Sequence, residues 1–379
     1  MAYENNHYIP RFILRQFGEY LNVYNVKDGS LCIGERTDHI FAERKIYPSD
    51  LEKDIGYKLE SPFAKLFHNK LMSGKPGDKI VLTRKEILLM KRFYLLETIR
   101  VTSMAEITKK EKALSGFYSS LFSDFNEKLI PDETTTDRWL RNIRVVIESE
   151  DLIQISKHPL CTYEVLKWSF ILNSGYFAFW DCAGSGVDFL ISDIGMTSEV
   201  EPSMLTDGYE HTKKDYLYKL FERETNIFKK DAYQRLLSAQ SLFYENFYMY
   251  PLSKNRMIVT VNPFFSLYDR KTKLTKPIGI WPTQISDKRL LEKNESPKLV
   301  TIMGKPLCKD DDEFSYTIQR VKPEDAEYIN MLMLNRIDTY MGYSDWKHIE
   351  SSVKRYIDFH NKIKMKPPID YKSLTEKAR

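Results

Sequence analysis

Glycine, proline and cysteine are scarce in this chain, which has 15 glycines, 16 prolines and four cysteines among 379 residues. So few glycines and prolines exclude collagen-like and low-complexity chains, which depend on these residues. They also disfavour a turn-dense β-sandwich, because tight turns need glycine and proline for their backbone angles. The four cysteines form no CxxC pair and no zinc-finger spacing, so we expect reduced thiols in a cytoplasmic protein.

Long apolar runs and a large net charge are also missing. The longest apolar stretch, residues 165–182, is interrupted by Lys167, Asn173 and Asp181, so we expect no membrane span. The first residues contain no apolar segment typical of a secretory signal, and we expect none. The net charge of +4 lies below the strongly basic balance typical of nucleic-acid-binding domains.

One segment departs from this neutral balance. Residues 354–379 contain eight Lys and Arg side chains against three Asp and Glu. A basic tail of this kind can contact the phosphates of a nucleic acid by displacing counterions. A solvated terminal helix with a frayed end is the alternative, and the sequence leaves both open.

The residues that are abundant point to a mixed, helix-rich fold. Apolar residues make up 42% of the chain and aromatic residues 13%, which is enough for a globular core. Residues 21–34 are typical of a β-hairpin with an Asp28-Gly29 turn. Helical spacing of apolar residues recurs in four other segments, at residues 51–71, 84–123, 133–173 and 323–341. We therefore expect an α+β fold that is predominantly helical, with small antiparallel β-sheet or hairpin elements.

The same pattern gives an outline of the domains. Residues 1–344 are predicted to form a single domain, with a proline-containing surface insertion at 269–312. Residues 345–379 are predicted to be a basic, helical C-terminal extension.

Two local patterns carry more specific expectations. Ser61 and Pro62 predict that the helix at 51–71 is restarted there, with Ser61 as its N-cap. Residues 176–182 and 187–193 are typical of two strands joined by the glycine-containing turn AGSG. That turn leads into no helix, and no phosphate-binding loop, dinucleotide fingerprint, HExxH or GxSxG motif occurs in the chain.

Polar side chains on apolar helix faces are the first candidate site residues. Arg100 falls on the same arc as Phe93, Leu96 and Met104 of its predicted helix, and a buried arginine needs carboxylate or carbonyl partners. Its planar guanidinium suits a carboxylate or a phosphate, so a structural ion pair and a functional pocket both stay open. Glu60, at the border of an apolar stripe, is a candidate partner.

Two further polar residues occupy notable positions. Asn330 lies within the apolar stripe of the last predicted helix, where a buried amide must be satisfied and the capping of a loop is one way to do so. Asp193 ends the predicted strand at 187–193. A carboxylate there can serve as a base, a metal ligand or a turn cap.

The opening residues HYIPRFILRQF interleave basic side chains with aromatic and apolar ones. A four-residue spacing places His7, Arg11 and Arg15 on one side if the chain is helical after Pro10. Histidine suits proton transfer near neutral pH, and arginine beside it suits a phosphate or a developing anion. A lone histidine is also common in purely structural roles, so both interpretations remain.

These positions resemble the motifs of a bacterial family known as domain of unknown function 4238. HYIPRFILRQF resembles its H-Y-[IV]-P-[RQ]-[FY]-x-L-[RK]-x-F signature, and the LNVYNVKDG hairpin follows as in the family. Arg100 lies in LLETIRVTS, which resembles the Q-x-x-R-[TS] helix with Glu97 where glutamine is usual. Weaker matches follow in chain order. Leu59 and Glu60 match an I-E pair, and Ser192 and Asp193 match F-x-x-S-D-N-P, in which Ile194 and Gly195 replace Asn-Pro. Ser253 matches P-L-S-P, and Asn330 matches a closing I-N pair. The resemblance spans roughly residues 5–344.

The resemblance implies a role in bacterial antiphage defence, with which some members are associated, but no reaction. Our first hypothesis is an effector that hydrolyses phosphodiester bonds in RNA or DNA. The catalytic candidates are His7 as general acid or base, Arg11 and Arg100 as phosphate contacts, and Asp193 and Glu60 as ligands of a divalent metal ion or as groups that orient His7. The binding candidates are Arg15, Ser192, Ser253 and Asn330.

The second hypothesis is a non-catalytic sensor or binding protein of a defence system, in which the same polar groups form a structural network. An enzyme acting on a nucleotide or another small phosphate is a third alternative. A nucleic acid and a phage component are candidate partners, and we expect no membrane contact. The sequence leaves the cofactor, including a divalent metal ion, and the oligomeric state open.

Overall fold

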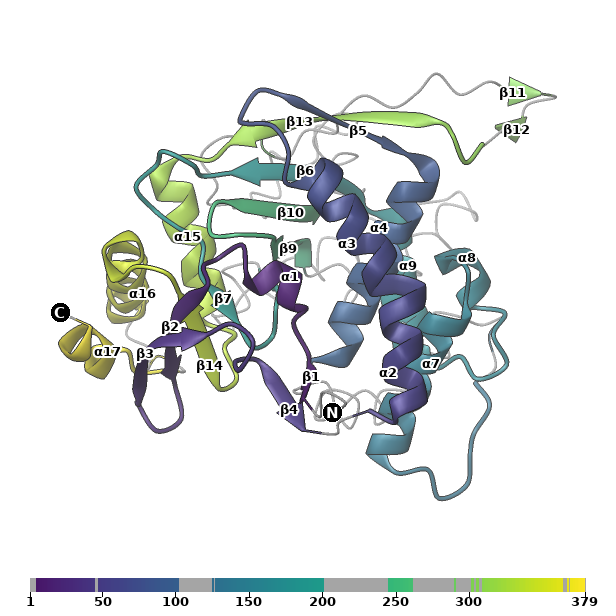
Figure 1. Ribbon diagram of the computed structural model, residues 1–379, viewed down its shortest axis with the longest axis horizontal. Helices are drawn as coiled ribbons and strands as arrows, with labels where there is room; N and C mark the ends of the chain where they lie inside the picture. The colour runs from purple at the N-terminus through teal and green to yellow at the C-terminus, as the bar shows by residue number, and fades with distance from the viewer. Residues whose placement is uncertain are drawn as a thin grey trace, which may run out of the picture.

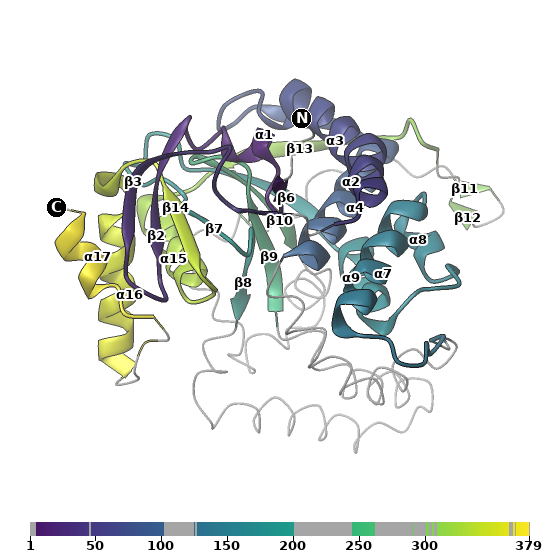
Figure 2. The same ribbon diagram turned by 60° about the horizontal axis from the view of Figure 1, so that its bottom comes forward.

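The fold is α+β, as predicted, and is built in layers around a six-stranded sheet (Figures 1 and 2). The computed structural model describes residues 5–44, 47–101, 125, 127–200, 245–261, 290, 301–302, 305–306, 309–363, 367 and 369–378. Helices contribute strongly, but the central sheet is larger than the small hairpin elements expected. Most of the insertion predicted at 269–312 lies outside the described residues.

The central sheet brings together strands from distant parts of the chain. Its order is β5 (Lys79–Thr83), β13 (Glu313–Arg320), β6 (Tyr176–Asp181), β10 (Arg256–Val261), β9 (Glu245–Pro251) and β8 (Thr197–Val200). Neighbouring strands are antiparallel except for β13 and β6. Along β6, Phe177 and Phe179 enter one core while Ala178 and Trp180 enter the other. This strand is buried on both faces, which is why its sequence is almost continuously apolar.

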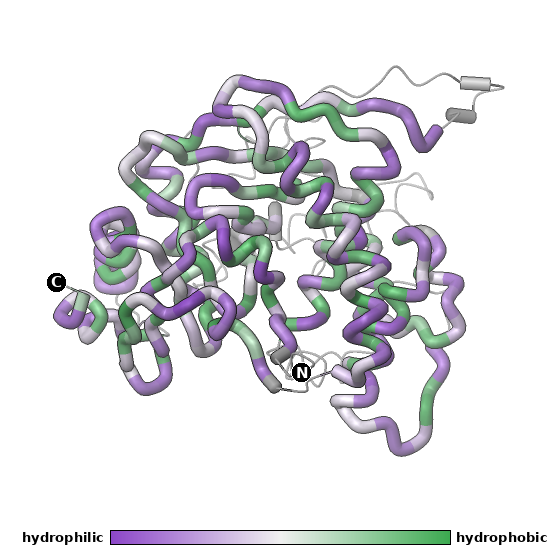
Figure 3. The backbone as a smooth tube through the Cα atoms, in the orientation of Figure 1, coloured by the Kyte–Doolittle hydropathy of each residue, from purple (hydrophilic) through white to green (hydrophobic). Residues whose placement is uncertain are grey.

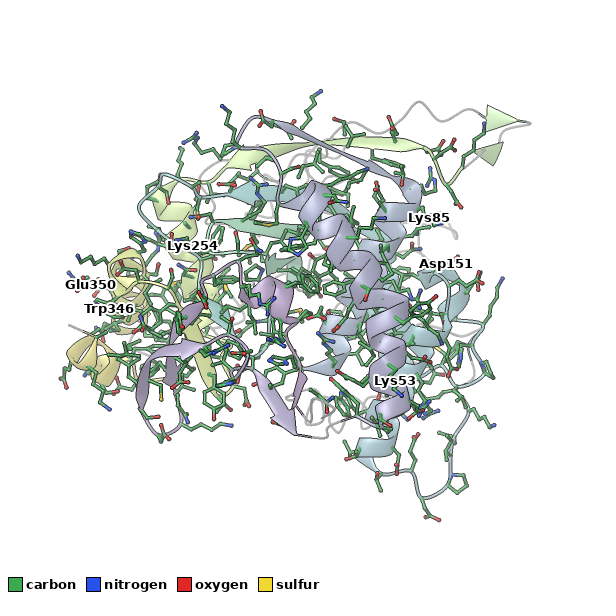
Figure 4. All side chains as sticks on the ribbon, viewed as in Figure 1. Lys53, Lys85, Asp151, Lys254, Trp346 and Glu350 are labelled. Atoms are coloured by element: carbon green, nitrogen blue, oxygen red, sulfur yellow. The ribbon has the colours of Figure 1, made fainter. Side chains whose placement is uncertain are left out.

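Helices cover the first face of the sheet, as the helical spacing predicted. They are α2 (Ser49–Ile55), α3 (Ser61–Leu66), α4 (Arg84–Arg100), α7 (Thr135–Glu148), α8 (Leu152–Ile155) and α9 (Tyr163–Ser174). Helix α4 begins at a reciprocal capping box between Thr83 and Glu86. The part of its predicted helix beyond residue 101 lies outside the described residues. Figure 4 shows side chains filling the space behind this helical layer, with Lys53 and Lys85 near its two ends.

The α-helix α3 begins at Ser61, as expected, but the expected role of Ser61 as its N-cap is wrong. The chain stays helical from Ser49 to Leu71, and Ser61 has α-helical angles (φ −65°, ψ −45°) rather than those of an N-cap. Two π-helical turns, Gly56–Glu60 and Phe67–Leu71, are part of this run. A proline lacks the N–H that an α-helix uses, and the wider turn just before Pro62 takes up this break. Glu60 is therefore the last residue of a π turn.

A second, four-stranded sheet and the C-terminal helices form the other layer. The sheet order is β3 (Leu31–Arg36), β2 (Tyr20–Asn25), β14 (Tyr340–Tyr343) and β7 (Ile191–Ser192). The hairpin predicted at 21–34 is confirmed, with strands that extend to Tyr20 and Arg36. Its turn places Gly29 at φ +70°, a conformation that glycine adopts without strain.

The expected strand–turn–strand at 176–193 is wrong in its second half. Strand β6 belongs to the central sheet, whereas only Ile191 and Ser192 form a strand, and that strand lies in the second sheet. The residues between them cross from one sheet to the other. Val187, Phe189 and Leu190 are apolar because they fill the second core, not because they pair with β6. A buried crossing segment and a buried strand have the same apolar pattern.

The C-terminal residues pack against this second core. Helices α15 (Pro323–Leu334), α16 (Glu350–Ile363) and α17 (Lys372–Lys377) lie beside the second sheet (Figure 2). Tyr371 is fully buried and donates its hydroxyl to the carbonyl of Leu334 at 2.9 Å. The hydroxyl groups of Tyr24 and Ser373 are 2.6 Å apart. The described part of the basic tail is thus held by residues of the preceding 344.

Hydropathy follows these layers (Figure 3): apolar residues concentrate along the central strands and on the inward sides of the helices.

None of the helices in the described part of the chain is long and apolar enough to cross a membrane. Of the cysteines described, Cys161 and Cys182 are buried and Cys32 is exposed, and all three are free thiols. Cys308 lies outside the described residues.

The N-terminal segment lies between the two layers and carries the first site candidates. Strand β1 (Asn5–His7) pairs with β4 (Ala42–Arg44), and the short helix α1 (Arg11–Leu14) follows. Tyr8 and Ile9 are buried between these elements, and the amide of Tyr8 donates to the carbonyl of Phe41 at 3.1 Å. His7 is therefore fixed on its main chain from both sides.

Candidate functional site

Arg100 is the centre of a buried polar cluster at the end of α4. Its side chain is 1% exposed, and Nη1 donates to Glu60 Oε1 at 2.6 Å, which confirms the predicted partner. Nε donates to the carbonyl oxygen of Tyr8 at 3.0 Å, and Nη2 lies 2.9 Å from Glu97 Oε1, although neither of these two atoms has a hydrogen-bond partner among the described residues. One guanidinium thus joins the N-terminal segment, the π turn and α4.

The sequence places these groups together for local reasons. Glu97 stands three residues before Arg100, a spacing that puts two side chains on the same helix face. Glu60 ends the π turn of the neighbouring helix. The main chain at the end of α4 is held by Trp139, whose Nε1 donates to the carbonyl of Ile99 at 2.8 Å. The guanidinium is therefore presented to its partners by a fixed helix end.

The cluster contains more acid than base. Glu52 is a third acid that interacts with this cluster. Burial and, second, repulsion from Glu60 raise the pKa of Glu52. Burial raises the pKa of Glu97 to about 8, against the opposing charge of Arg100. Although burial disfavours its charge, the carboxylates of Glu97 and Glu60 hold the pKa of Arg100 above its usual value. Arg100 stays charged, and Glu97 keeps a proton near neutral pH.

Glu97→Gln is expected to stabilise the fold at alkaline pH. Because the folded pKa of Glu97, about 8, exceeds the usual value of 4.5, the folded protein binds this proton more tightly than the unfolded chain. Tighter proton binding by folded Glu97 contributes its full stabilisation of the fold below pH 4.5, and this contribution is lost as the pH rises through 8. A neutral glutamine removes the loss, so urea unfolding at pH 9 should show a gain of about 1–3 kcal/mol that disappears by pH 5. The exposed Glu313→Gln is the control, and an equal response of the two variants would contradict the assignment.

His7 lies beside this cluster and is half-buried. Its ring makes a hydrogen bond to the backbone of Asp38, and its Nε2 has no hydrogen-bond partner among the described residues. The bond to Asp38 therefore involves Nδ1, which donates to the carbonyl and leaves a lone pair on Nε2. Burial, followed by the charge of Arg11, lowers the pKa of His7 to about 4. The ring is neutral near pH 7 and presents an accepting nitrogen.

The structure brings two of the three predicted N-terminal residues into this region. Arg11 begins α1 and acts on His7 through its charge, while its Nη2 lies 3.6 Å from Asp38 Oδ2. Arg15 follows the last residue of α1 and is exposed to solvent. His7 itself is in strand β1, so the three residues do not share one helix. The side chains of Arg11 and Glu60 are 31% and 27% exposed, which connects the buried cluster with solvent.

Asp193 is a turn cap in the structure. Its carboxylate accepts the amides of Asp338 at 3.2 Å, Thr339 at 2.6 Å and Tyr340 at 3.0 Å. Burial raises the pKa of Asp193 to about 6, against these three hydrogen bonds. Its charge acts on the buried Tyr8, but within the described ranges no hydrogen bond or ion pair joins it to His7 or to Arg100.

The binding candidates from the weaker motifs lie in a turn, a strand and a helix. Ser253 accepts the amides of Asn255 at 3.1 Å and Arg256 at 2.8 Å within the turn between β9 and β10. Asn330 is fully buried and caps the crossing segment, as anticipated: it accepts the amide of Leu190 at 3.2 Å and donates to the carbonyl of Asp188 at 2.8 Å. Ser192 is fully buried in β7 beside Asp193. These residues do not join the Arg100 cluster.

Sequence reasoning missed several members of the site. Tyr47 stacks on Trp139 with ring centroids 5.4 Å apart, and burial raises its pKa although Arg100 opposes this. Its hydroxyl has no partner in the part of the chain that the structure describes. Glu97 was detectable from its spacing to Arg100, whereas Asp38 lies in a loop that has no periodicity to mark it.

The described residues around Arg100 and His7 offer no group of side chains arranged to bind a metal ion. Among the residues placed by the structure, no three His, Cys, Asp or Glu side chains come together in a way that would hold a metal ion. The two carboxylates proposed as ligands lie in separate networks, with Glu60 on Arg100 and Asp193 on the turn at 338–340. We therefore derive no step that depends on a metal ion.

Comparison with known proteins gives one match. A family model described as a protein of unknown function (DUF4238) matches residues 5–340. A search of curated proteins finds no match, and a search of solved structures finds none either.

Proposed function

Because the chain belongs to the DUF4238 family, which has a motif pattern but no assigned reaction, we propose a function from its own residues. The proposal is a bacterial antiphage defence effector that hydrolyses phosphodiester bonds in RNA or DNA, with His7 at the reacting centre. The observation that supports it is the state of His7: a neutral, half-buried ring beside the cation Arg11, with a buried Nε2 that lacks a partner among the described residues and becomes available to a substrate that displaces the side chains covering it. Such a ring is prepared to take a proton next to an anion site.

The chemistry follows from the charges around His7. A phosphodiester bound against Arg11 adds negative charge beside the ring, which raises the pKa of His7 from about 4 toward neutrality. Nε2 then takes the proton of the attacking hydroxyl or water, and the same proton is returned to the leaving oxygen. Arg100 is a positioning residue in this scheme, because Nη1 and Nε donate to Glu60 and to the carbonyl of Tyr8, and Nη2 lies beside Glu97.

A non-catalytic sensor is the second candidate function, and a specific observation favours it. The polar groups at most motif positions are satisfied by protein partners: Arg100 by acids, Asp193 and Ser253 by amides, Asn330 by main chain. A buried network whose groups bond to one another specifies a unique packing and needs no substrate to explain it. In this alternative the motif holds the shape of a surface that recognises a phage component.

The proposal includes a cytoplasmic location, where phage nucleic acid is exposed to the effector. The free thiols of Cys32, Cys161 and Cys182 are compatible with that compartment.

A phage challenge separates the two candidate functions. Cells expressing wild type are expected to survive as a culture while total RNA or DNA is fragmented, and His7→Gln is expected to abolish both effects. Arg144→Gln, which changes an exposed arginine paired with Asp50 at 3.1 Å, is the matched control and should protect like wild type. Protection by wild type with intact RNA and DNA would contradict the hydrolase and favour the sensor.

A further inference from the structure

The carboxylate of Asp38 lies among three side chains that carry or can carry positive charge. Arg36 binds it in a bidentate manner, with Nε and Nη2 each 3.0 Å from one carboxylate oxygen. Arg11 approaches Oδ2 at 3.6 Å and His39 Nε2 approaches Oδ1 at 3.9 Å. Two permanent cations thus share one acid, and Glu19 is the further acid whose charge reaches Arg36.

Asp38 is also the residue that orients His7. Its main-chain carbonyl accepts from the ring of His7, while its side chain faces the arginines. The cationic group and the ring of His7, which bonds through Nδ1, are therefore both attached to one residue of the loop between β3 and β4. Charge around His7 and the position of its ring are linked through Asp38.

We infer that Arg11, Arg36 and His39 form a subsite for a phosphate of the nucleic-acid backbone, which the carboxylate of Asp38 fills when no substrate is bound. The inference rests on the proposed function and adds the substrate class. A guanidinium fork fits two oxygens of a phosphate as it fits a carboxylate. With Arg36 58% and His39 64% exposed, the pairs on Asp38 are of the solvent-exposed kind that contributes little to stability, so a phosphate can replace them.

The subsite contacts the phosphates of the nucleic-acid backbone and makes no contact with a base or a sugar. Contacts to phosphate fix the position of a strand without distinguishing its sequence. RNA and DNA of the same length should therefore respond equally to changes at residues 36 and 38. Each phosphate contact that is lost should also reduce the salt dependence of binding.

Binding of a fluorescein-labelled 12-nucleotide oligouridine, and of its deoxy counterpart, tests the subsite by anisotropy. His7→Gln is present throughout so that the probe is not cut. Asp38→Asn keeps the shape of the side chain but removes the competing charge, and should tighten binding about three- to tenfold. Arg36→Gln should weaken binding by a similar factor and lower the slope of log Kd against log salt by about one. Arg144→Gln should change neither.

The outcomes separate the subsite from the hydrolase. Unchanged or weaker binding by Asp38→Asn, together with no effect of Arg36→Gln, overturns the subsite, as does the absence of any binding. If binding responds as expected but protein with His7 intact leaves both oligonucleotides uncut, the subsite stands and the hydrolase fails. If the oligonucleotide is cut and KM is the same for Arg36→Gln and wild type, the hydrolase stands and the subsite fails. A response of RNA but not DNA would overturn a backbone-only subsite.

Discussion

Replacing Arg100 by methionine is expected to lower the free energy of unfolding by about 3–5 kcal/mol. Methionine fills much of the same volume, so the loss comes from charge rather than from a cavity. It leaves the carboxylate of Glu60 and the carbonyl of Tyr8 without their donor, and it removes the charge that opposes the burial of Glu97. Urea unfolding at pH 7, followed by circular dichroism, measures the difference.

Arg144→Met is the control for this experiment. Arg144 also pairs with an aspartate, but its side chain is 38% exposed, and its replacement should change stability by less than about 0.5 kcal/mol. Adding Glu97→Gln to Arg100→Met should change little at pH 7, because Glu97 already carries a proton there and loses the charge that lowers its pKa. A loss below about 1 kcal/mol for Arg100→Met would show that the cluster does not hold the N-terminal segment in place.

His7→Gln is expected to slow phosphodiester cleavage by about 10²–10⁴-fold while leaving the fold intact. Glutamine retains a donor for the carbonyl of Asp38, but it cannot take a proton. The wild-type rate should also fall in acid as the ring of His7 becomes charged, and the variant should lose this dependence. Cleavage of a labelled oligonucleotide from pH 4 to 8 gives both quantities, with urea unfolding as the measure of folding.

Asp193→Asn is the comparison variant, for which we expect a loss of stability rather than a loss of catalysis. Its carboxylate accepts three amides of the turn before β14, so the change should reduce stability by about 1–3 kcal/mol and affect activity only through the folded fraction. Full activity of His7→Gln would remove His7 from the reaction. Simultaneous unfolding of both variants would assign His7 to the structural network instead.

Part of the site was predictable because it obeys helix geometry. Arg100 interrupts an apolar face of its helix, which predicted both its burial and its need for an acid. Glu60 was identified as a partner because it borders the apolar stripe of a neighbouring predicted helix. Asn330 was recognised for the same reason, and its burial and hydrogen bonds agree with the capping role considered for it.

Other features depend on contacts that a linear pattern does not contain. Asp38 is brought to Arg11 and His7 by the pairing of β1 with β4, and no spacing in the sequence marks that pairing. The segment at 187–190 has the composition of a strand, but it fills a core between two sheets. Pro62 has the sequence of a helix start, yet it lies inside a helix whose wider turn accommodates it.

The two π turns also explain why one helix keeps the same side inward over its whole length. Six buried residues recur there at intervals of four: Leu51, Ile55, Leu59, Phe63, Phe67 and Leu71. In a regular α-helix each such interval overshoots a full rotation by about 40°, so five intervals would accumulate about 200°. Each π turn holds one additional residue and takes back about 100°. The additional residue in each turn, more than its identity, sets the phase of the helix. A single deletion within Gly56–Glu60 would therefore leave a regular helix with the same side inward, whereas a deletion outside the π turns would rotate every following side chain by about 100°.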